Sequence, residues 1–82
     1  MKIVVYIRLK DTVLDPQGKA VVGGLRDLGF TEVADVKVGK MIELYIGDVA
    51  VSAEALTGRV REMCQKLLVN TVIEDFRFEV VG

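Results

Sequence analysis

Apolar and polar residues alternate along several stretches of the chain. In residues 2–9 every second side chain is aliphatic, and in residues 75–80 two phenylalanines and a valine alternate with charged residues. Successive side chains of a β-strand point to opposite faces, so both stretches are predicted to be strands with one apolar face. Residues 33–38 and 41–46 show the same alternation, and Gly39-Lys40 between them is predicted to form a two-residue hairpin loop.

Between these strands the apolar residues recur at helical spacing. Residues 16–28 are predicted to form a helix with Val21, Leu25 and Leu28 on one stripe. Asp15 precedes this helix as an N-cap, and Pro16 takes its first position, where the missing N–H costs nothing. Gly29 would end it in a left-handed conformation. A second helix, capped by Ser52, is predicted from a stripe made of Leu56, Val60, Met63, Cys64 and Leu67.

The predicted order is strand, helix, strand, strand, helix, strand. This order is typical of an α+β, ferredoxin-like βαββαβ domain, an antiparallel four-stranded sheet with two helices on one face. The other face of the sheet would then carry Val4, Tyr6, Met41 and Tyr45. These side chains are too apolar to be left in water, so we expect this face to pair with another subunit.

The composition fits one domain spanning residues 1–82 and gives no sign of a nucleic-acid or membrane partner. Of the 82 residues, 51% are hydrophobic and 28% are charged, and the net charge is -1. Lysines and arginines are dispersed, which argues against binding to nucleic acid or to anionic membranes. No signal peptide or membrane span is predicted, and the single cysteine excludes an internal disulfide, so we expect a cytoplasmic protein.

Candidate catalytic and metal-binding groups are few. Asp11 and Asp15 flank the first strand–helix loop, but no third ligand lies nearby in the sequence, and a loop charge with a helix cap explains them. The chain has no histidine, so Cys64 has no imidazole base to activate it and is predicted to be a core residue. Phosphate-binding glycine motifs are also absent from the sequence. We therefore expect no catalytic, cofactor-binding or metal-binding residues.

Four motifs in the same order resemble the PurS family, the small subunit of phosphoribosylformylglycinamidine synthase. They are Leu14-Asp15-Pro16-Gln17-Gly18, the Leu28-Gly29 helix end, Gly39-Lys40 followed by Glu43-Leu44, and the segment from Cys64 through Asn70 to Asp75. The resemblance covers essentially the whole chain. One departure is Thr71, which stands where the family usually has a proline after the asparagine, and this loosens the turn into the last strand.

The resemblance implies a non-catalytic assembly subunit that acts in purine biosynthesis. In this family the complex converts formylglycinamide ribonucleotide to formylglycinamidine ribonucleotide, and ATP, Mg and glutamine are used by the partner subunits. The subunit would bridge a glutaminase (PurQ) and a synthetase (PurL), support ammonia transfer between them, and form a homodimer or tetramer. The complex is thus a carbon–nitrogen ligase, while this chain would hold no active site of its own.

The sequence leaves two further readings open, an ACT-like module that binds a small ligand at a dimer interface and, with less support, a stand-alone enzyme. Under the assembly reading, three surface segments are expected to contact partners: the turn before the first helix, the hairpin tip and the turn before the last strand. Their residues are Asp15, Pro16, Gln17, Gly18, Lys40, Asn70 and Glu74. Gln17 followed by Gly18 is the pair that helix-start chemistry does not explain, because glycine is a poor helix former.

Overall fold

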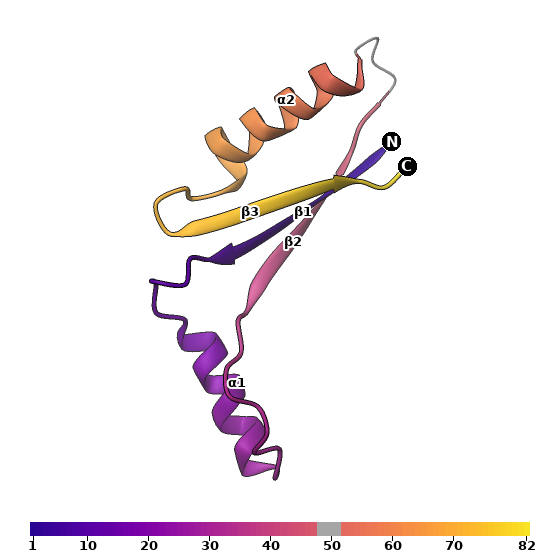
Figure 1. The fold of residues 1–82 in the computed structure, drawn as a ribbon. Helices are drawn as coiled ribbons and strands as arrows, with labels where there is room; N and C mark the ends of the chain where they lie inside the picture. Colours follow the sequence, from indigo (N-terminus) through magenta and orange to yellow (C-terminus); the bar gives the residue numbers. More distant parts are fainter. Residues whose placement is uncertain (48–51) are drawn as a thin grey trace.

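The computed structural model describes residues 1–47 and 52–82 (Figure 1). In chain order the elements are β1 (Lys2–Leu9), α1 (Pro16–Asp27), β2 (Gly39–Tyr45), α2 (Ala53–Met63), a π-helical turn η1 (Cys64–Leu68) and β3 (Glu74–Val80). The strands form an antiparallel sheet in the order β2-β1-β3, so β1 lies in the middle. The α+β class is confirmed, with three strands in the sheet of the described residues rather than four.

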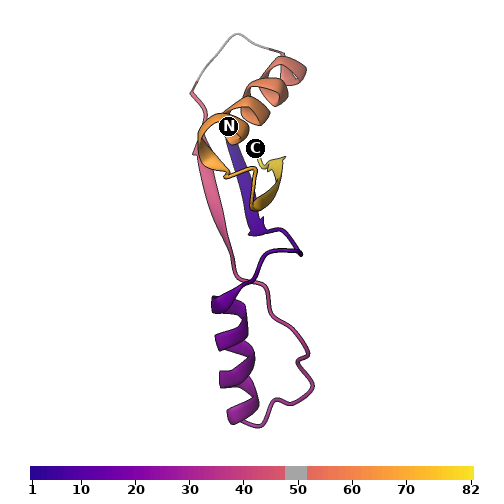
Figure 2. The same ribbon diagram turned by 90° about the vertical axis from the view of Figure 1, so that its left-hand side faces the viewer.

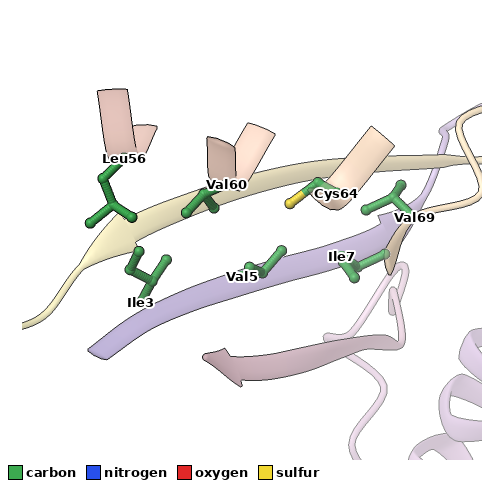
Figure 3. Close-up of a cluster of buried hydrophobic side chains, with 7 residues drawn as sticks. All are labelled: Ile3, Val5, Ile7, Leu56, Val60, Cys64 and Val69. Carbon is green, nitrogen blue, oxygen red and sulfur yellow. The ribbon is translucent and has the colours of Figure 1, made fainter. Parts of the chain in front are cut away.

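The core lies between the sheet and α2. Every second residue of β1 is apolar, and Figure 3 shows Ile3, Val5 and Ile7 pointing toward the stripe of α2 and η1. Burial of this apolar area is the main favourable term in folding the chain. The buried cluster consists of Ile3, Val5, Ile7, Leu56, Val60, Cys64 and Val69. The predicted role of Cys64 as a core residue is confirmed, since its side chain is fully buried.

The predicted hairpin at Gly39-Lys40 is wrong. Gly39 lies opposite Arg8 within β2, so this dipeptide belongs to a strand that continues straight out of the sheet. Residues 33–38 form no strand, and they run beside the first turn of α1 instead. The Val38 amide donates there to the Asp15 Oδ2 atom at 3.0 Å, and this bond replaces the pairing with residues 41–46 that the alternation suggested.

The two helices do not share one face of the sheet. Figures 1 and 2 show α2 lying across β1 and β3, whereas α1 projects beyond the end of the sheet. We call residues 10–38, which leave the sheet after β1 and return to it at β2, the arm. With the arm extended, the molecule measures 53 × 26 × 15 Å. The chain termini lie together at the other end of the sheet (Figure 1).

Both helices begin as the sequence predicts, and α1 also ends as predicted, whereas α2 passes into η1 and Asn70 does not end it in a left-handed conformation. Asp15 caps α1, and Gly29 follows it with φ +96°. The Phe30 amide donates to the Leu25 carbonyl at 2.9 Å and the Gly29 amide to the Arg26 carbonyl at 3.0 Å, which is the Schellman arrangement. Ser52 Oγ accepts from the Ala55 amide at the start of α2. No helix within residues 1–47 and 52–82 is long and apolar enough to span a membrane.

Candidate functional site: the neck between sheet and arm

Most of the predicted contact residues come together at the junction of the sheet and the arm. They border a hollow of about 410 Å³, which we call the neck hollow. Its walls come from the end of β1, the start of α1, the start of β2 and the first residue of β3, four segments far apart in the sequence. The lining residues are Ile7, Arg8, Leu9, Asp15, Pro16, Gln17, Val38, Gly39, Lys40 and Glu74.

Asp15 ties the two chain segments of the neck together. One carboxylate oxygen accepts from the Gly18 amide at 2.9 Å, and the other accepts from the Val38 amide at 3.0 Å. These two backbone hydrogen bonds, with the nearby Lys37 charge, hold the pKa of the Asp15 carboxyl below its usual range despite its burial. Asp15 is only 7% exposed, so its carboxylate stabilises the turn from a buried position.

Gly18 is required by the packing of the neck. A Cβ atom built at this position would lie 2.0 Å from the Val36 carbonyl oxygen and 2.9 Å from Asp15 Oδ2. Any side chain here would push residues 33–38 away from α1, because real Cβ atoms do not approach backbone oxygens so closely. The glycine that helix propensity left unexplained is therefore explained by close backbone approach.

The third predicted segment is a tight turn that leads into β3. The Asn70 amide donates to Glu74 Oε1 at 2.8 Å, and the Asn70 carbonyl accepts from the amides of Ile73 and Glu74. Asn70 Oδ1 also accepts from the Val72 amide at 3.2 Å. Glu74 then extends toward Lys40, with 3.7 Å between its Oε2 atom and the Lys40 Nζ atom. Asn70 itself does not line the hollow, but its turn fixes Glu74 at the rim.

The predicted subunit-facing side of the sheet is partly covered by polar side chains. Val4 is buried, and the Tyr6 hydroxyl donates to Glu79 Oε1 at 2.8 Å. The Arg77 guanidinium lies 4.1 Å from the centre of the Tyr6 ring. The hydrogen bond to Glu79 raises the pKa of the Tyr6 hydroxyl. The register places Met41 and Tyr45 on the same side as Val4 and Tyr6, and both are exposed.

Metal-ligating and nucleophilic side chains were sought among the described residues. No group of three or more potential metal ligands occurs among residues 1–47 and 52–82. The Cys64 thiol is buried in the core, and this burial raises its pKa, so it stays a poor nucleophile. Every buried polar side chain of the described segments has a hydrogen-bond partner.

Sequence reasoning missed one apolar surface. It placed Val21, Leu25 and Leu28 on one stripe of a helix expected to lie on a face of the sheet, but the arm leaves Leu28 75% exposed and Val21 42% exposed. The periodicity of α1 shows that the stripe exists, and it carries no information about which molecule covers it. Two residues of the sequence did point to the neck. Helix propensity singled out Gly18 and capping singled out Asp15, but neither signal showed that residues 36–38 pack against them.

Comparisons with known proteins agree with the resemblance read from the motifs. The family described as PurS, phosphoribosylformylglycinamidine (FGAM) synthase, matches residues 2–82. The PurS subunit of phosphoribosylformylglycinamidine synthase from Bacillus subtilis is 52% identical over 79 residues, which cover 96% of this chain and 90% of that relative. A solved structure of B. subtilis PurS has a TM-score of 0.82 and 49% identity and covers 99% of this chain and 98% of that one.

A structure of PurLQS from Thermotoga maritima contains a chain that is similar at 28% identity, with a TM-score of 0.85. The match covers 98% of this chain and 95% of that chain. Sequence and fold thus agree along nearly the whole length of the molecule, including the arm. The chain belongs to the PurS family.

Proposed function

We propose that this chain is the non-catalytic assembly subunit of a phosphoribosylformylglycinamidine synthase in purine biosynthesis. In this role it bridges the glutaminase and synthetase subunits and supports the transfer of ammonia from one to the other. ATP, Mg and glutamine are used by those partners, and the complex works in the cytoplasm. The observation that carries the proposal is the family match over residues 2–82, together with 52% identity to a relative named as this subunit.

Two further observations support an assembly role. The T. maritima relative lies in a structure named PurLQS, so that relative occurs with the L and Q subunits. The described residues of this chain hold no cluster of metal ligands and no exposed thiol, and the whole chain lacks histidine. A small domain that is extended and lacks reactive groups is suited to holding other proteins in place.

Within this role the exposed residues around the neck hollow are the proposed contacts to the partner subunits. Asp15 and Gly18 hold the turn from inside, and this turn presents Pro16 and Gln17 at the surface. Lys40 stands at the opposite rim, and the turn from Asn70 to Glu74 supports it through the ion pair. The sheet face with Val4, Tyr6, Met41 and Tyr45 is proposed as a surface between copies of the chain.

Reconstitution tests the proposal directly. The chain is mixed with the glutaminase and synthetase subunits of the same organism in the presence of glutamine and Mg-ADP, and the mixture is separated by gel filtration. We expect all three to elute together and glutamine-dependent synthesis to require this chain. Synthesis with ammonium chloride should proceed without it, because the synthetase holds the ATP-dependent chemistry. Equal glutamine-dependent rates with and without the chain would refute the assembly role.

The neck contacts are tested with matched lysine variants. Lys40→Gln removes a charge from the hollow, and Lys66→Gln removes one from the distant ion pair between Glu62 of α2 and Lys66 of η1. We expect Lys40→Gln to weaken binding of the partners about 10-fold and Lys66→Gln to leave it unchanged. Gln17→Ala should behave like Lys40→Gln. Equal affinity in all variants would place the docking surface elsewhere on the chain.

The ligand-binding alternative predicts a different result. An ACT-like module would be stabilised by its ligand, so amino acids or nucleotides would raise the melting temperature of the isolated chain. The assembly role predicts no such shift with either class of ligand. A thermal-shift panel therefore separates the two functions without the partner subunits.

A further inference from the structure

Strand β3 forms one edge of the sheet, because within the described chain it pairs with β1 alone (Figure 1). Its register with β1 is unbroken from Glu74 to Val80, so no bulge interrupts the strand, and it contains no proline. Bulges and prolines are among the devices that protect sheet edges, since unpaired amides and carbonyls are a template for another strand. The regular edge of β3 is therefore suited to pairing with a further strand.

The hydrogen bonds between β1 and β3 show which backbone groups of this edge are free. Just beyond the ladder the Lys10 amide donates to the Ile73 carbonyl at 2.8 Å. In an antiparallel pair such bonds recur at every second residue, so the odd-numbered residues of β3 bond to β1. The amides and carbonyls of Phe76, Phe78 and Val80 therefore point outward, and they have no main-chain partner within residues 1–47 and 52–82.

The face of β3 that is turned away from α2 carries a charged row, which consists of Asp75, Arg77 and Glu79. Among the described residues none of the three has an oppositely charged side chain within 4.0 Å. Arg8 lies opposite Asp75 in the register, but its guanidinium lies 3.8 Å from the Asp11 carboxylate instead. Opposite charges on neighbouring strands attract, so the charged row favours an added strand with basic, acidic and basic side chains in this order.

The core side of the same edge is apolar and incompletely covered. Phe76 and Phe78 are half-buried, and their nearly parallel rings have centroids 6.5 Å apart. The Arg61 guanidinium of α2 lies 5.4 Å from the centre of the Phe78 ring, and Val80 is 55% exposed. An added strand would cover the open sides of these side chains with apolar residues of its own. The edge thus favours a segment in which apolar and charged residues alternate.

A hollow of about 280 Å³ lies beside the charged row. Its lining residues are Tyr6, Ile7, Arg8, Asp75, Phe76 and Arg77. Domains that bind peptides by strand addition gain affinity from main-chain hydrogen bonds and specificity from pockets for alternate side chains. The two arginines and one aspartate of this hollow suit an acidic side chain that lies opposite Arg77 and is followed by a basic one opposite Asp75.

We propose that the outer edge of β3 binds an extended segment of a partner subunit as an added strand. The main chain of the segment bonds to the free groups of the edge, and its charged side chains run basic, acidic, basic opposite the charged row. A second β3 fits less well, because the register that overlaps both strands fully places Arg77 opposite Arg77 and Asp75 opposite Glu79. This inference rests on the proposed function, since the segment belongs to one of the two partner subunits.

Methylation of one backbone amide tests strand addition without changing a side chain. Cys64 is the single cysteine, so a synthetic segment 64–82 can be ligated to a thioester of residues 1–63 with the sequence unaltered. One segment is unmodified, and the other carries an N-methyl group on the outward Phe78 amide. With glutamine, Mg-ADP and both partner subunits, we expect the methylated chain to bind at least about 10-fold more weakly. Equal affinities overturn the proposal and leave the assembly role intact, whereas no binding of the unmodified chain refutes both.

Charge reversal keeps the proposal falsifiable if the methylated chain fails to fold. Arg77→Glu reverses the middle charge of the row, and Arg59→Glu reverses an exposed charge on α2. We expect Arg77→Glu to weaken partner binding about 10-fold and Arg59→Glu to leave it unchanged. Equal effects of the two reversals overturn the proposal. A lower molar mass of the isolated Arg77→Glu chain in light scattering also overturns it, because the edge would then join copies of the chain.

Discussion

In the half of the molecule formed by the sheet and α2, apolar side chains from separate elements bury one another. In the arm, the buried groups at the neck are the carboxylate of Asp15 and the backbone of Gly18. The first half gains its stability from the area that it removes from water. The arm keeps its position through hydrogen bonds and close backbone packing, while its apolar stripe stays exposed. The two halves therefore respond to different kinds of substitution.

This contrast also separates the buried platform from the surface that we propose for partner contacts. The core between β1 and α2 supplies a stable platform and has few residues that a partner could reach. The arm and the neck hollow supply the reachable residues, including Gln17 and Lys40. Loops and extensions on a rigid scaffold commonly carry the contacts of a protein, and here the scaffold is only a small sheet and one helix.

A core truncation should produce the largest effect. Ile3 is 1% exposed and packs against α2, so Ile3→Ala leaves a cavity and should lower the free energy of unfolding by roughly 2–5 kcal/mol. Leu67→Ala removes a side chain that is 84% exposed and should change it by less than about 0.5 kcal/mol. Urea unfolding at one fixed protein concentration measures both. Similar values for the two variants would mean that β1 is not the centre of the core.

Glycine variants within α1 test the neck. Gly18→Ala places a Cβ atom against the Val36 carbonyl and should cost roughly 1–3 kcal/mol, because backbone on both sides resists movement. Gly23→Ala is the matched control in the same helix, where nothing lies within 4 Å of the new atom. It should stabilise the chain by about 0.5–1 kcal/mol through helix propensity. Urea unfolding of both variants measures the change in the free energy of unfolding, which should have opposite signs. A stabilising effect of Gly18→Ala would show that the backbone at the neck moves apart more easily than its close contacts indicate.

Much of the fold was predictable because its signals are local. The alternation in residues 2–9, the caps Asp15 and Ser52, and the stripe of Leu56 and Val60 each lie within a few residues, and the structure confirms them. The path of the chain at Gly39-Lys40 was not predictable, because a hairpin and a straight strand place the same alternating side chains on similar faces. The local pattern shows which residues favour burial. It does not show whether the same chain or a second copy covers them.

The site was predictable to a similar extent. Family motifs pointed to Asp15, Gln17, Lys40 and Glu74, and the structure brings all four to one hollow. The approach of residues 36–38 to Gly18 could not be read from the sequence, since it joins segments about twenty residues apart without a recognisable pair of side chains. A glycine in the first turn of a helix was the one visible sign that another backbone passes close by.

The smallest effect should come from the carboxylate that fastens the arm, and its dependence on pH is distinctive. The folded-state pKa of Asp15 lies below its unfolded value, because the Gly18 and Val38 amides donate to the ionised form. Its contribution to stability is therefore complete above pH about 4 and is lost as the pH falls through the folded pKa. Asp15→Ala should lower the melting temperature by about 5 °C at pH 7, and this gap between variant and wild type should narrow below pH 4.

Glu32→Ala, which removes an exposed carboxylate from the same arm, should show no such gap in melting curves between pH 3 and pH 7. A gap for Asp15→Ala that is constant across this range would mean that its two hydrogen bonds do not depend on the charge of the carboxylate, and the arm would then be held by the packing at Gly18 alone.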